Sequence, residues 1–533
     1  MSRRIFISVF AFLSCLPSAV GISPTAFSSV RVGGELRTRI ERNFQRLHED
    51  RYQPQRVFLT DEESGYWPGD YEGRTLLALV MDAQTLAQEP LYLQQFLQLL
   101  PAHLNERGYM GSISDEVISE QQLSGNGWLL RGLCEYYAWK GDKTVLPIIR
   151  NIAQNLFVRA RGQYSKYPIN PDQRRQNVGD ASGSQQNIVD GWLLSSDVGC
   201  VFIGMEGLIH AYQYVKTKEM RGVIEEMIAR FLSIDLVAIK AQTHASLTAC
   251  RGLVRWGDLT GCSKFYDDAE YRYKLYKQYG MTANYENFNW FGRRDTWTEP
   301  CAIVDSYMLA LQLWERTGKA EYRTDAELIY YNALCHTQRY NGGFGCDSCL
   351  SDEQPALSIH APEAYWCCTM RGAEGLATAA RYSYMLQTDT LVLPFLHESK
   401  LLLHAKNGVL AISQHTDYPF GDSVILTIGE NSTDICAVSL PVLPWAGSFA
   451  FYVNGHSIQP AQHNGFFILP HKPCAGDTIK VSFRLKNCQH GHRCFYGPLL
   501  LGADADNPSV LSPVYHLLDP KVWGKGYLKQ IVF

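Results

Sequence analysis

Four side chains of the types that bind metal ions stand at two places in the sequence. Glu299 and Cys301 flank Pro300, and Cys367 and Cys368 are adjacent. Residues two apart do not share a helix face. Glu299 and Cys301 can therefore reach one point only from a loop or a helix start, and proline suits the first helical position. One carboxylate and three thiolates form a tetrahedral ligand set that Zn²⁺ accepts.

Two other interpretations of these residues remain open from the sequence alone. The three cysteines can be buried and inert, because free cysteine packs as a small apolar residue. The negative charge of Glu299 would then only stabilise the positive end of the helix dipole. The run Cys346-Asp347-Ser348-Cys349 could also form a separate metal or disulfide site.

The elements that would position these residues are predicted to be helices. From about residue 35 to residue 388 the apolar residues follow a helical spacing. Six segments share a small or turn-forming start, an amphipathic run and an aromatic or charged end, with second helices between them. They begin near Gly73, Gly127, Cys200, His244, Cys301 and Cys367. We predict an all-α catalytic domain over residues 22–389, an (α/α)6 toroid whose inner helices begin around a central cavity.

Beyond about residue 390 the pattern changes to short strands separated by Gly, Pro, Asp and Asn. The predicted strands are Leu391–Phe395, Lys400–His404, Val424–Ile428, Cys436–Leu440, Phe449–Val453 and Ile479–Phe483. Pro394 restricts the first of them to a sheet edge. We predict that residues 390–533 form an all-β sandwich domain.

The N-terminus has the features of an export signal. Arg3 and Arg4 precede the apolar run Ile5–Leu13, and small residues around Ala19 offer a cleavage site. We therefore predict a signal peptide over residues 1–21 and a periplasmic or secreted protein, with lipoprotein anchoring at Cys15 a weaker alternative. No later stretch is long enough to predict a transmembrane segment.

The composition is that of a globular protein and argues against polyanion binding. Of the 533 residues 46% are hydrophobic and 19% charged, and the formal net charge is −4. There is no dense Lys/Arg block, so nucleic acid is not an expected partner. The 30 Tyr and 11 Trp are typical of proteins that bind neutral ligands such as sugars. Trp67, Asp70, Glu72 and Trp128 are candidate pocket residues.

The cysteine motifs resemble those of glycoside hydrolase family 127, the β-L-arabinofuranosidase family. The resemblance rests first on Thr298–Cys301 followed after a helix by Trp366–Cys368, and on Thr243-His244-Ala245. It extends through the predicted sandwich at Asp417–Asp422, Pro444–Ala446, Val453–Gly455, Gly476-Asp477 and Tyr496–Pro498. The family has an (α/α)6 barrel followed by a β-sandwich, which agrees with the predicted organisation.

The resemblance implies a zinc-dependent retaining glycosidase that removes β-L-arabinofuranose or a related terminal sugar from a glycan. Cys367 would be the nucleophile and a zinc ligand, with Glu299, Cys301 and Cys368 as the other ligands. Glu286, followed by Phe288, would be the acid/base, although Tyr285 replaces the family's glycine. Asp295 and Glu363 are alternative acids. His244 and Trp128 would bind the substrate.

The sequence also departs from the family's pattern. Sugar-binding histidines at the starts of earlier inner helices are replaced at Gly127-Trp128 and at Gly204-Met205-Glu206, so the sugar recognised can differ. Two alternative functions remain at this stage. One is a non-catalytic carbohydrate-binding relative with a structural thiol–zinc site. The other, less favoured, is a polysaccharide lyase, because this architecture also hosts lyases.

Overall fold

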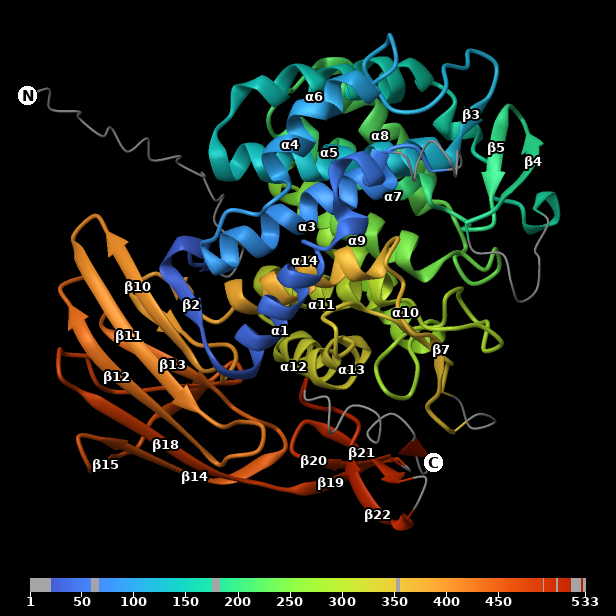
Figure 1. The fold of residues 1–533 in the computed structure, drawn as a ribbon. Helices are drawn as coiled ribbons and strands as arrows, with labels where there is room; N and C mark the ends of the chain where they lie inside the picture. The colour runs from blue at the N-terminus through green and yellow to red at the C-terminus, as the bar shows by residue number, and fades with distance from the viewer. Residues whose placement is uncertain are drawn as a thin grey trace, which may run out of the picture.

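The computed structural model describes residues 21–58, 67–174, 183–350, 355–491, 493–504, 507–518 and 529–530. It confirms the predicted order of a helical half followed by a strand-rich half (Figure 1). The predicted signal peptide, Cys15 included, lies outside the described residues apart from Gly21. Within the described ranges, no helix combines the length and apolar character needed to cross a bilayer.

Six helices form a closed ring, in which each packs against the next and the last packs against the first. In order they are α3 (Asp70–Leu86), α5 (Glu120–Lys140), α7 (Val201–Tyr212), α9 (Thr243–Thr260), α11 (Pro300–Thr317) and α14 (Cys368–Arg381). These inner helices are buried on all sides near their starts, since every residue of Asp70–Ala83 and of Glu120–Cys134 is buried. A helix buried all round must have partners on every face.

Other helices pack outside the ring. They are α1 (Gly34–Arg46), α4 (Leu93–Leu99), α6 (Leu146–Ile152), α8 (Lys218–Leu232), α10 (Lys264–Tyr279) and α12 (Ala320–Ile329). These helices bury one face only, as α8 does with Met220, Val223, Ile224, Met227, Ile228 and Phe231. A short helix, α13 (Cys335–Thr337), follows α12 after a π-helical turn.

Glycines bring three inner helices into close contact. A Cβ on Gly73 would lie 2.2 Å from the backbone nitrogen of Leu129, and one on Gly127 would lie 2.5 Å from the Cα of Gly204. No real Cβ approaches backbone so closely, so α3, α5 and α7 can pack only with glycine at these positions. The family resemblance would place sugar-binding histidines near Gly127 and Gly204. In this structure these two positions instead form contacts between helices.

The strand-rich half contains two large sheets. One has the order β1 (Ile22–Pro24), β8 (Met385–Gln387), β9 (Thr390–Val392), β13 (Ala437–Pro441), β17 (Phe466–Ile468), β16 (Ala461–His463). The other has the order β15 (His456–Ile458), β14 (Ala446–Val453), β18 (Thr478–Leu485), β12 (Ser423–Asn431), β11 (Gly408–Thr416), β10 (Ser399–Ala405), β2 (Val30–Val32). All six predicted strands are present, although the first, β9, ends before Pro394 and lies between β8 and β13 rather than at a sheet edge. The sequence analysis did not predict the other strands of these sheets, which are β1, β2, β8, β11, β15, β16 and β17.

The strand-rich half differs from the predicted domain in two ways. First, β1 and β2 precede the helices in sequence but pair with β8 and β10. Second, the last strands form a separate sheet, β19 (Asn487–His490), β20 (Arg493–Tyr496), β21 (Leu499–Asp504), β22 (Asn507–Pro513), with β23 (Lys529–Gln530) beside β21. This C-terminal sheet contacts the helical half, where Asn332 donates to the Pro498 carbonyl at 2.9 Å.

Two small sheets lie among the helices. One joins β3 (Ile118–Ser119), β5 (Trp192–Ser195) and β4 (Gln185–Val189), and the other joins β6 (Cys346–Asp347) and β7 (Ile359–Ala361). Backbone hydrogen bonds between Thr298 and Asp347 attach β6 to the segment before α11, because Thr298 N donates to Asp347 O at 2.8 Å. These sheets hold the long connections at the starts of the inner helices.

The glycine contact gives a testable prediction. Gly127→Ala should destabilise the protein by about 1–3 kcal/mol, because the new methyl group overpacks the α5–α7 contact. The control is Gly222→Ala on α8, where the new Cβ would meet only the Arg161 side chain at 3.8 Å. That change should be neutral or stabilising by up to about 1 kcal/mol, since alanine favours helix. Denaturant unfolding measures both, and equal effects would contradict the prediction.

Candidate active site

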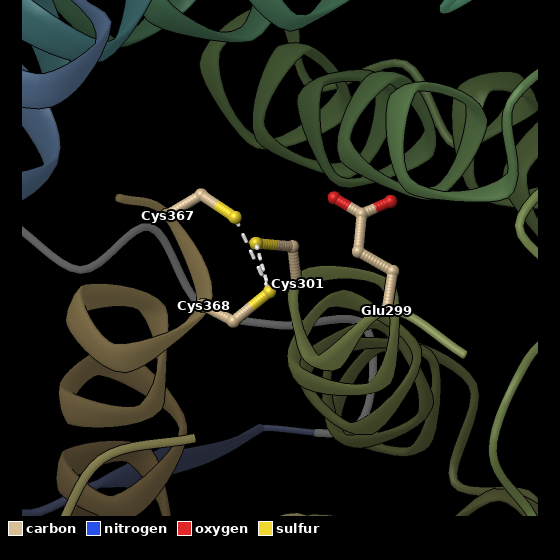
Figure 2. A group of neighbouring side chains, drawn as sticks. All are labelled: Glu299, Cys301, Cys367 and Cys368. Atoms are coloured by element: carbon tan, nitrogen blue, oxygen red, sulfur yellow. Dashed lines mark hydrogen bonds between the residues drawn. The ribbon is translucent and has the colours of Figure 1, made fainter. Parts of the chain in front are cut away.

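The four candidate ligands meet at the starts of two neighbouring inner helices (Figure 2). Glu299 is the residue before α11 and Cys301 is its second residue, while Cys367 immediately precedes α14 and Cys368 begins it. One ligand atom from each of the four lies within 4.8 Å of all the others. The Cys368 sulfur is 3.3 Å from that of Cys367 and 3.6 Å from that of Cys301.

The spacing of the sulfurs suits a tetrahedral thiolate-binding cation. Zn–S bonds near 2.3 Å at tetrahedral angles place two sulfurs about 3.8 Å apart. Burial raises the pKa of the Cys301 and Cys368 thiols well above the usual range. Arg74 donates to Cys301 Sγ at 3.4 Å, and the Arg371 guanidinium also lies near Cys301. A bound divalent cation would supply the charge that three thiolates need.

A cavity of about 570 Å³ opens beside this cluster. Its wall includes residues near the starts of five inner helices: Asp70 and Arg74, Ile203, His244, Glu299, and Cys367 with Cys368. Aromatic side chains complete it, among them Trp67 and Trp297, which stacks on His360 with centroids 4.8 Å apart. Trp366 is 48% exposed at the same cavity. Aromatic walls with few charged groups suit a ligand of the size and polarity of a sugar.

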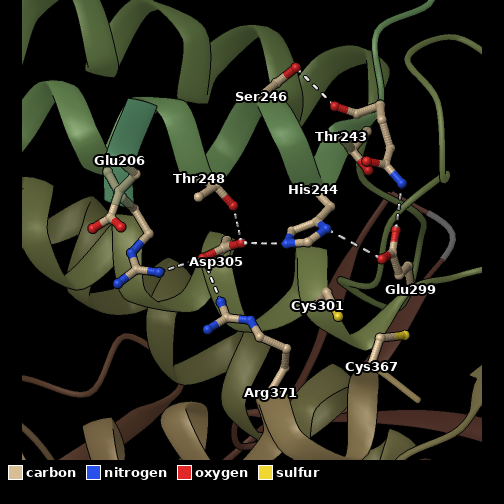
Figure 3. Close-up of polar contacts among 12 residues, drawn as sticks. Glu206, Thr243, His244, Ser246, Thr248, Glu299, Cys301, Asp305, Cys367 and Arg371 are labelled. Carbon is tan, nitrogen blue, oxygen red and sulfur yellow. Dashed lines mark hydrogen bonds and ion pairs between the residues drawn. The ribbon is translucent and has the colours of Figure 1, made fainter. Parts of the chain in front are cut away.

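His244 connects the cluster of candidate ligands to the buried centre of the ring (Figure 3). Its Nδ1 is 3.4 Å from a Glu299 oxygen, and its Nε2 is 3.3 Å from Asp305. Gln242 donates to the second Glu299 oxygen at 3.3 Å. These contacts fix the Glu299 carboxylate from the side opposite the cysteines, as the partners of metal ligands commonly do.

Asp305 is held by three donors in the interior. Arg251 contacts it at 2.5 Å, Arg371 at 2.7 Å and the Thr248 hydroxyl at 2.6 Å. Burial by itself would raise the pKa of Asp305, but Arg371 and Arg251 lower it further than burial raises it. Asp305 is therefore a charged group at all ordinary pH values.

Trp128 lies beneath the site and does not line the cavity. Its side chain is fully buried, and its ring stacks on His244 with centroids 5.8 Å apart. The guanidinium groups of Arg74, Arg131 and Arg371 lie 4.1, 4.3 and 4.6 Å from its ring centre. The ring thus takes part in cation–π and stacking contacts that support Arg74 and His244.

Glu286 is not among the residues that line the cavity. Tyr285 has a φ of 67°, in the left-handed region that favours glycine. The Glu286 carboxylate is fully buried, next to His336 and Asp347. Burial and the charge of Asp347 raise its pKa well above the usual range. The structure does not bring Glu286 to the cavity beside Cys367.

The alternative candidates are also in other places. Asp295 pairs with Arg293 at 3.0 Å and Glu363 with Arg46 at 2.7 Å, and neither lines the cavity. Glu72 is buried within α3. The two cysteines of the Cys-x-x-Cys run do not form a disulfide. Cys346 lines the cavity, whereas Cys349 contacts the Asn287 carbonyl.

The sequence analysis missed two charged residues of the cavity wall. Asp197 lies in the loop before α7, where its carboxylate accepts from the Gly183 N–H at 3.1 Å. Arg74 pairs with Asp70 at 2.7 Å and reaches Cys301. Asp197 follows a short strand with no motif around it, whereas Arg74 could have been found from its place at the start of a predicted inner helix.

Comparisons with known proteins bear on the strand-rich half and on the overall fold. Residues 390–485 match a family model described as the middle domain of family 127 β-L-arabinofuranosidases. This segment ends where β18 ends. No curated protein sequence matches the chain. The match and the structures described next confirm the resemblance to glycoside hydrolase family 127.

Three solved structures share the fold of nearly the whole chain. A glycoside hydrolase is 13% identical, with a TM-score of 0.68 over 91% of this chain and 83% of the other. A family 127 β-arabinofuranosidase is 14% identical, with a TM-score of 0.68 over 91% and 86%. A family 127 β-L-arabinofuranosidase from Geobacillus stearothermophilus T6 is 13% identical, with a TM-score of 0.65 over 89% and 86%.

The contacts of Asp305 give a second prediction. Asp305→Asn should destabilise the protein by about 3–5 kcal/mol, because the buried guanidinium groups of Arg251 and Arg371 would then share Glu374 as their one carboxylate partner. Glu225→Gln is the control, since Glu225 forms an exposed pair with Arg221 at 2.8 Å. The control should change the unfolding free energy by about 0–1 kcal/mol. Similar losses of unfolding free energy in the two variants would show that the buried pairs stabilise the protein no more than the exposed pair does.

Proposed function

Taking the chain as a divergent member of glycoside hydrolase family 127, we propose that it is an exported, zinc-dependent retaining glycosidase. Its substrate would be a glycan from which it removes β-L-arabinofuranose or a related terminal sugar. The observation that carries the proposal is the meeting of Glu299, Cys301, Cys367 and Cys368 within 4.8 Å at the wall of a cavity. We interpret the closed ring of helices as the (α/α)6 toroid of this family.

Zinc, held by these four residues, would keep the thiolates deprotonated at neutral pH. Cys367 is the ligand suited to attack the sugar, since it is the only partly exposed cysteine of the four-residue group and lines the cavity. Its thiolate would displace the leaving group at the anomeric carbon and form a thioglycosyl intermediate, which water then hydrolyses. Retention of configuration follows from these two successive displacements.

A retaining enzyme also needs an acid/base that faces the nucleophile across the glycosidic bond. Besides Glu299, the described carboxylates that line the cavity are Asp70 and Asp197. Asp70 is held in an ion pair with Arg74 at 2.7 Å, and using it in the reaction would break that pair. We therefore favour Asp197 over Glu286, whose carboxylate is buried elsewhere.

The bound sugar would rest between charged and aromatic walls. Arg74 offers hydrogen-bond donors on the side of the cysteines, His244 contributes a ring edge whose nitrogens face Glu299 and Asp305, and Trp67 and Trp366 offer flat apolar surfaces. Such a pocket excludes water from most of the sugar ring and gives the sugar hydroxyl groups a few fixed hydrogen-bond partners. The cavity opening beside Cys367 supports an enzyme more than a binding module with a closed structural metal site.

The nucleophile is tested by Cys367→Ser. Turnover of an aryl β-L-arabinofuranoside should fall to background, because an alkoxide is far harder to form than a thiolate. The control is Cys262→Ser at an exposed cysteine outside the cavity, which should keep the wild-type rate. Brief exposure of the wild type to an activated substrate, followed by peptide mass spectrometry, should find the sugar on Cys367. A sugar adduct on another residue would remove Cys367 from the mechanism.

The acid/base is tested by comparing Asp197→Asn with Glu286→Gln. Loss of the proton donor should lower turnover of substrates with poor leaving groups by about 10²–10⁴-fold. Substrates with an activated phenolic leaving group need little protonation, so their first step should survive. We expect this leaving-group dependence in Asp197→Asn. Its appearance in Glu286→Gln, with Asp197→Asn at the wild-type rate, would assign the role to Glu286 instead.

A further inference from the structure

A second group of metal-ligand side chains lies outside the cavity. Glu286, His336 and Asp347 each offer one ligand atom, and these atoms all lie within 4.8 Å of one another. All three side chains are fully buried. They come from distant parts of the sequence: the loop after α10, the short helix α13 and strand β6. The proposed glycosidase mechanism uses none of them.

The orientation of His336 is that of a metal-binding imidazole. Its Nδ1 is 3.0 Å from the Val514 carbonyl oxygen, which can only accept, so Nδ1 carries the hydrogen. The neutral ring then has its lone pair on Nε2, and Nε2 is 3.3 Å from an Asp347 oxygen. A lone pair that faces a carboxylate needs a proton or a metal ion between the two. A backbone carbonyl on the other ring nitrogen is the usual support of a histidine ligand.

The Glu286 carboxylate gives an independent indication. Neither of its oxygens has a hydrogen-bond partner, although both are buried. Asp347 is better satisfied, since Arg339 donates to its other oxygen at 2.8 Å. The Arg339 guanidinium lies near both carboxylates, so one guanidinium group faces two acids. An unpartnered buried carboxylate is costly unless it is protonated or bound to a cation.

From this geometry we propose that Glu286, His336 and Asp347 form a second metal site that binds a divalent transition-metal ion. One imidazole nitrogen and two carboxylate oxygens are ligands that Zn²⁺ accepts, with N and O distances near 2.0–2.2 Å. The imidazole disfavours Ca²⁺ and Mg²⁺, which take oxygen ligands. Because the site is buried, the ion would enter as the protein folds and would add to its stability.

The second site also supports the first one mechanically. Asn287, next to Glu286, accepts from the Glu299 N–H at 2.9 Å, and the Asp347 N–H donates to the Thr298 hydroxyl at 2.9 Å. An ion that fixes Glu286 and Asp347 would therefore fix both segments that hold the Glu299 backbone. Its role is structural, and the proposal does not depend on the glycosidase activity.

The test is elemental analysis of zinc and manganese in protein made in zinc-supplemented medium. The wild type should contain two metal ions per chain, and Glu286→Gln should contain one. The double variant Cys301→Ser/Cys368→Ser should retain one ion. The triple variant that also carries Glu286→Gln should retain none. The control is Asp325→Asn on α12, because the Asp325 carboxylate pairs with Lys277 at 2.6 Å. It should keep both ions, and circular dichroism would verify that each variant is folded.

Stability provides the second measurement. Refolding of Cys301→Ser/Cys368→Ser with zinc should raise its thermal midpoint above that of the same variant refolded with chelator, and Glu286→Gln should remove the difference. If the double-cysteine variant does not fold, the wild type and Glu286→Gln alone are compared. Equal metal content in these two proteins would overturn the proposal. The wild type could also contain one ion only. If Glu286→Gln then loses that ion and the double-cysteine variant keeps it, the result supports the proposed second site and refutes the thiolate site.

Discussion

The ring of inner helices is built around charged side chains that must neutralise one another. Arg131 pairs with Glu206 at 2.9 Å, Arg251 with Glu374 at 3.1 Å, and Arg371 with Asp305 at 2.7 Å. All six are nearly inaccessible to solvent and come from five of the six inner helices. Because an unpaired buried charge costs several kcal/mol, each helix can hold only the rotation and depth that keep its partners in reach.

This constraint extends directly to the reactive residues. Asp305 and the stacked ring of Trp128 fix His244, and His244 together with Gln242 fixes Glu299. Glu299 is thus attached to the interior of the ring, whereas the cysteines are attached to the starts of two helices. Ligands supported in this way need little reorganisation when an ion or substrate binds, which is what precise chemistry requires.

The sequence predicted the parts of the site that depend on local structure. Pro300 at a helix start and the adjacent Cys367 and Cys368 determine where the ligands stand on their helices, and helical spacing then brings those starts together. The contribution of Asp197 was not predictable, because it depends on a loop whose course is set by distant contacts. The pairing of β1 and β2 with strands more than 350 residues later was missed for the same reason.

Glu286 shows where a short motif stops being informative. Tyr285 has a left-handed backbone, at a cost of about 1–2 kcal/mol for a residue with a Cβ. The motif determines the local backbone, but it does not encode the surroundings of the side chain that follows. Those surroundings are His336 and Asp347, which other segments supply. Since a carboxyl's role follows from its neighbours, the same motif can hold a proton donor at a cavity or a ligand in the interior.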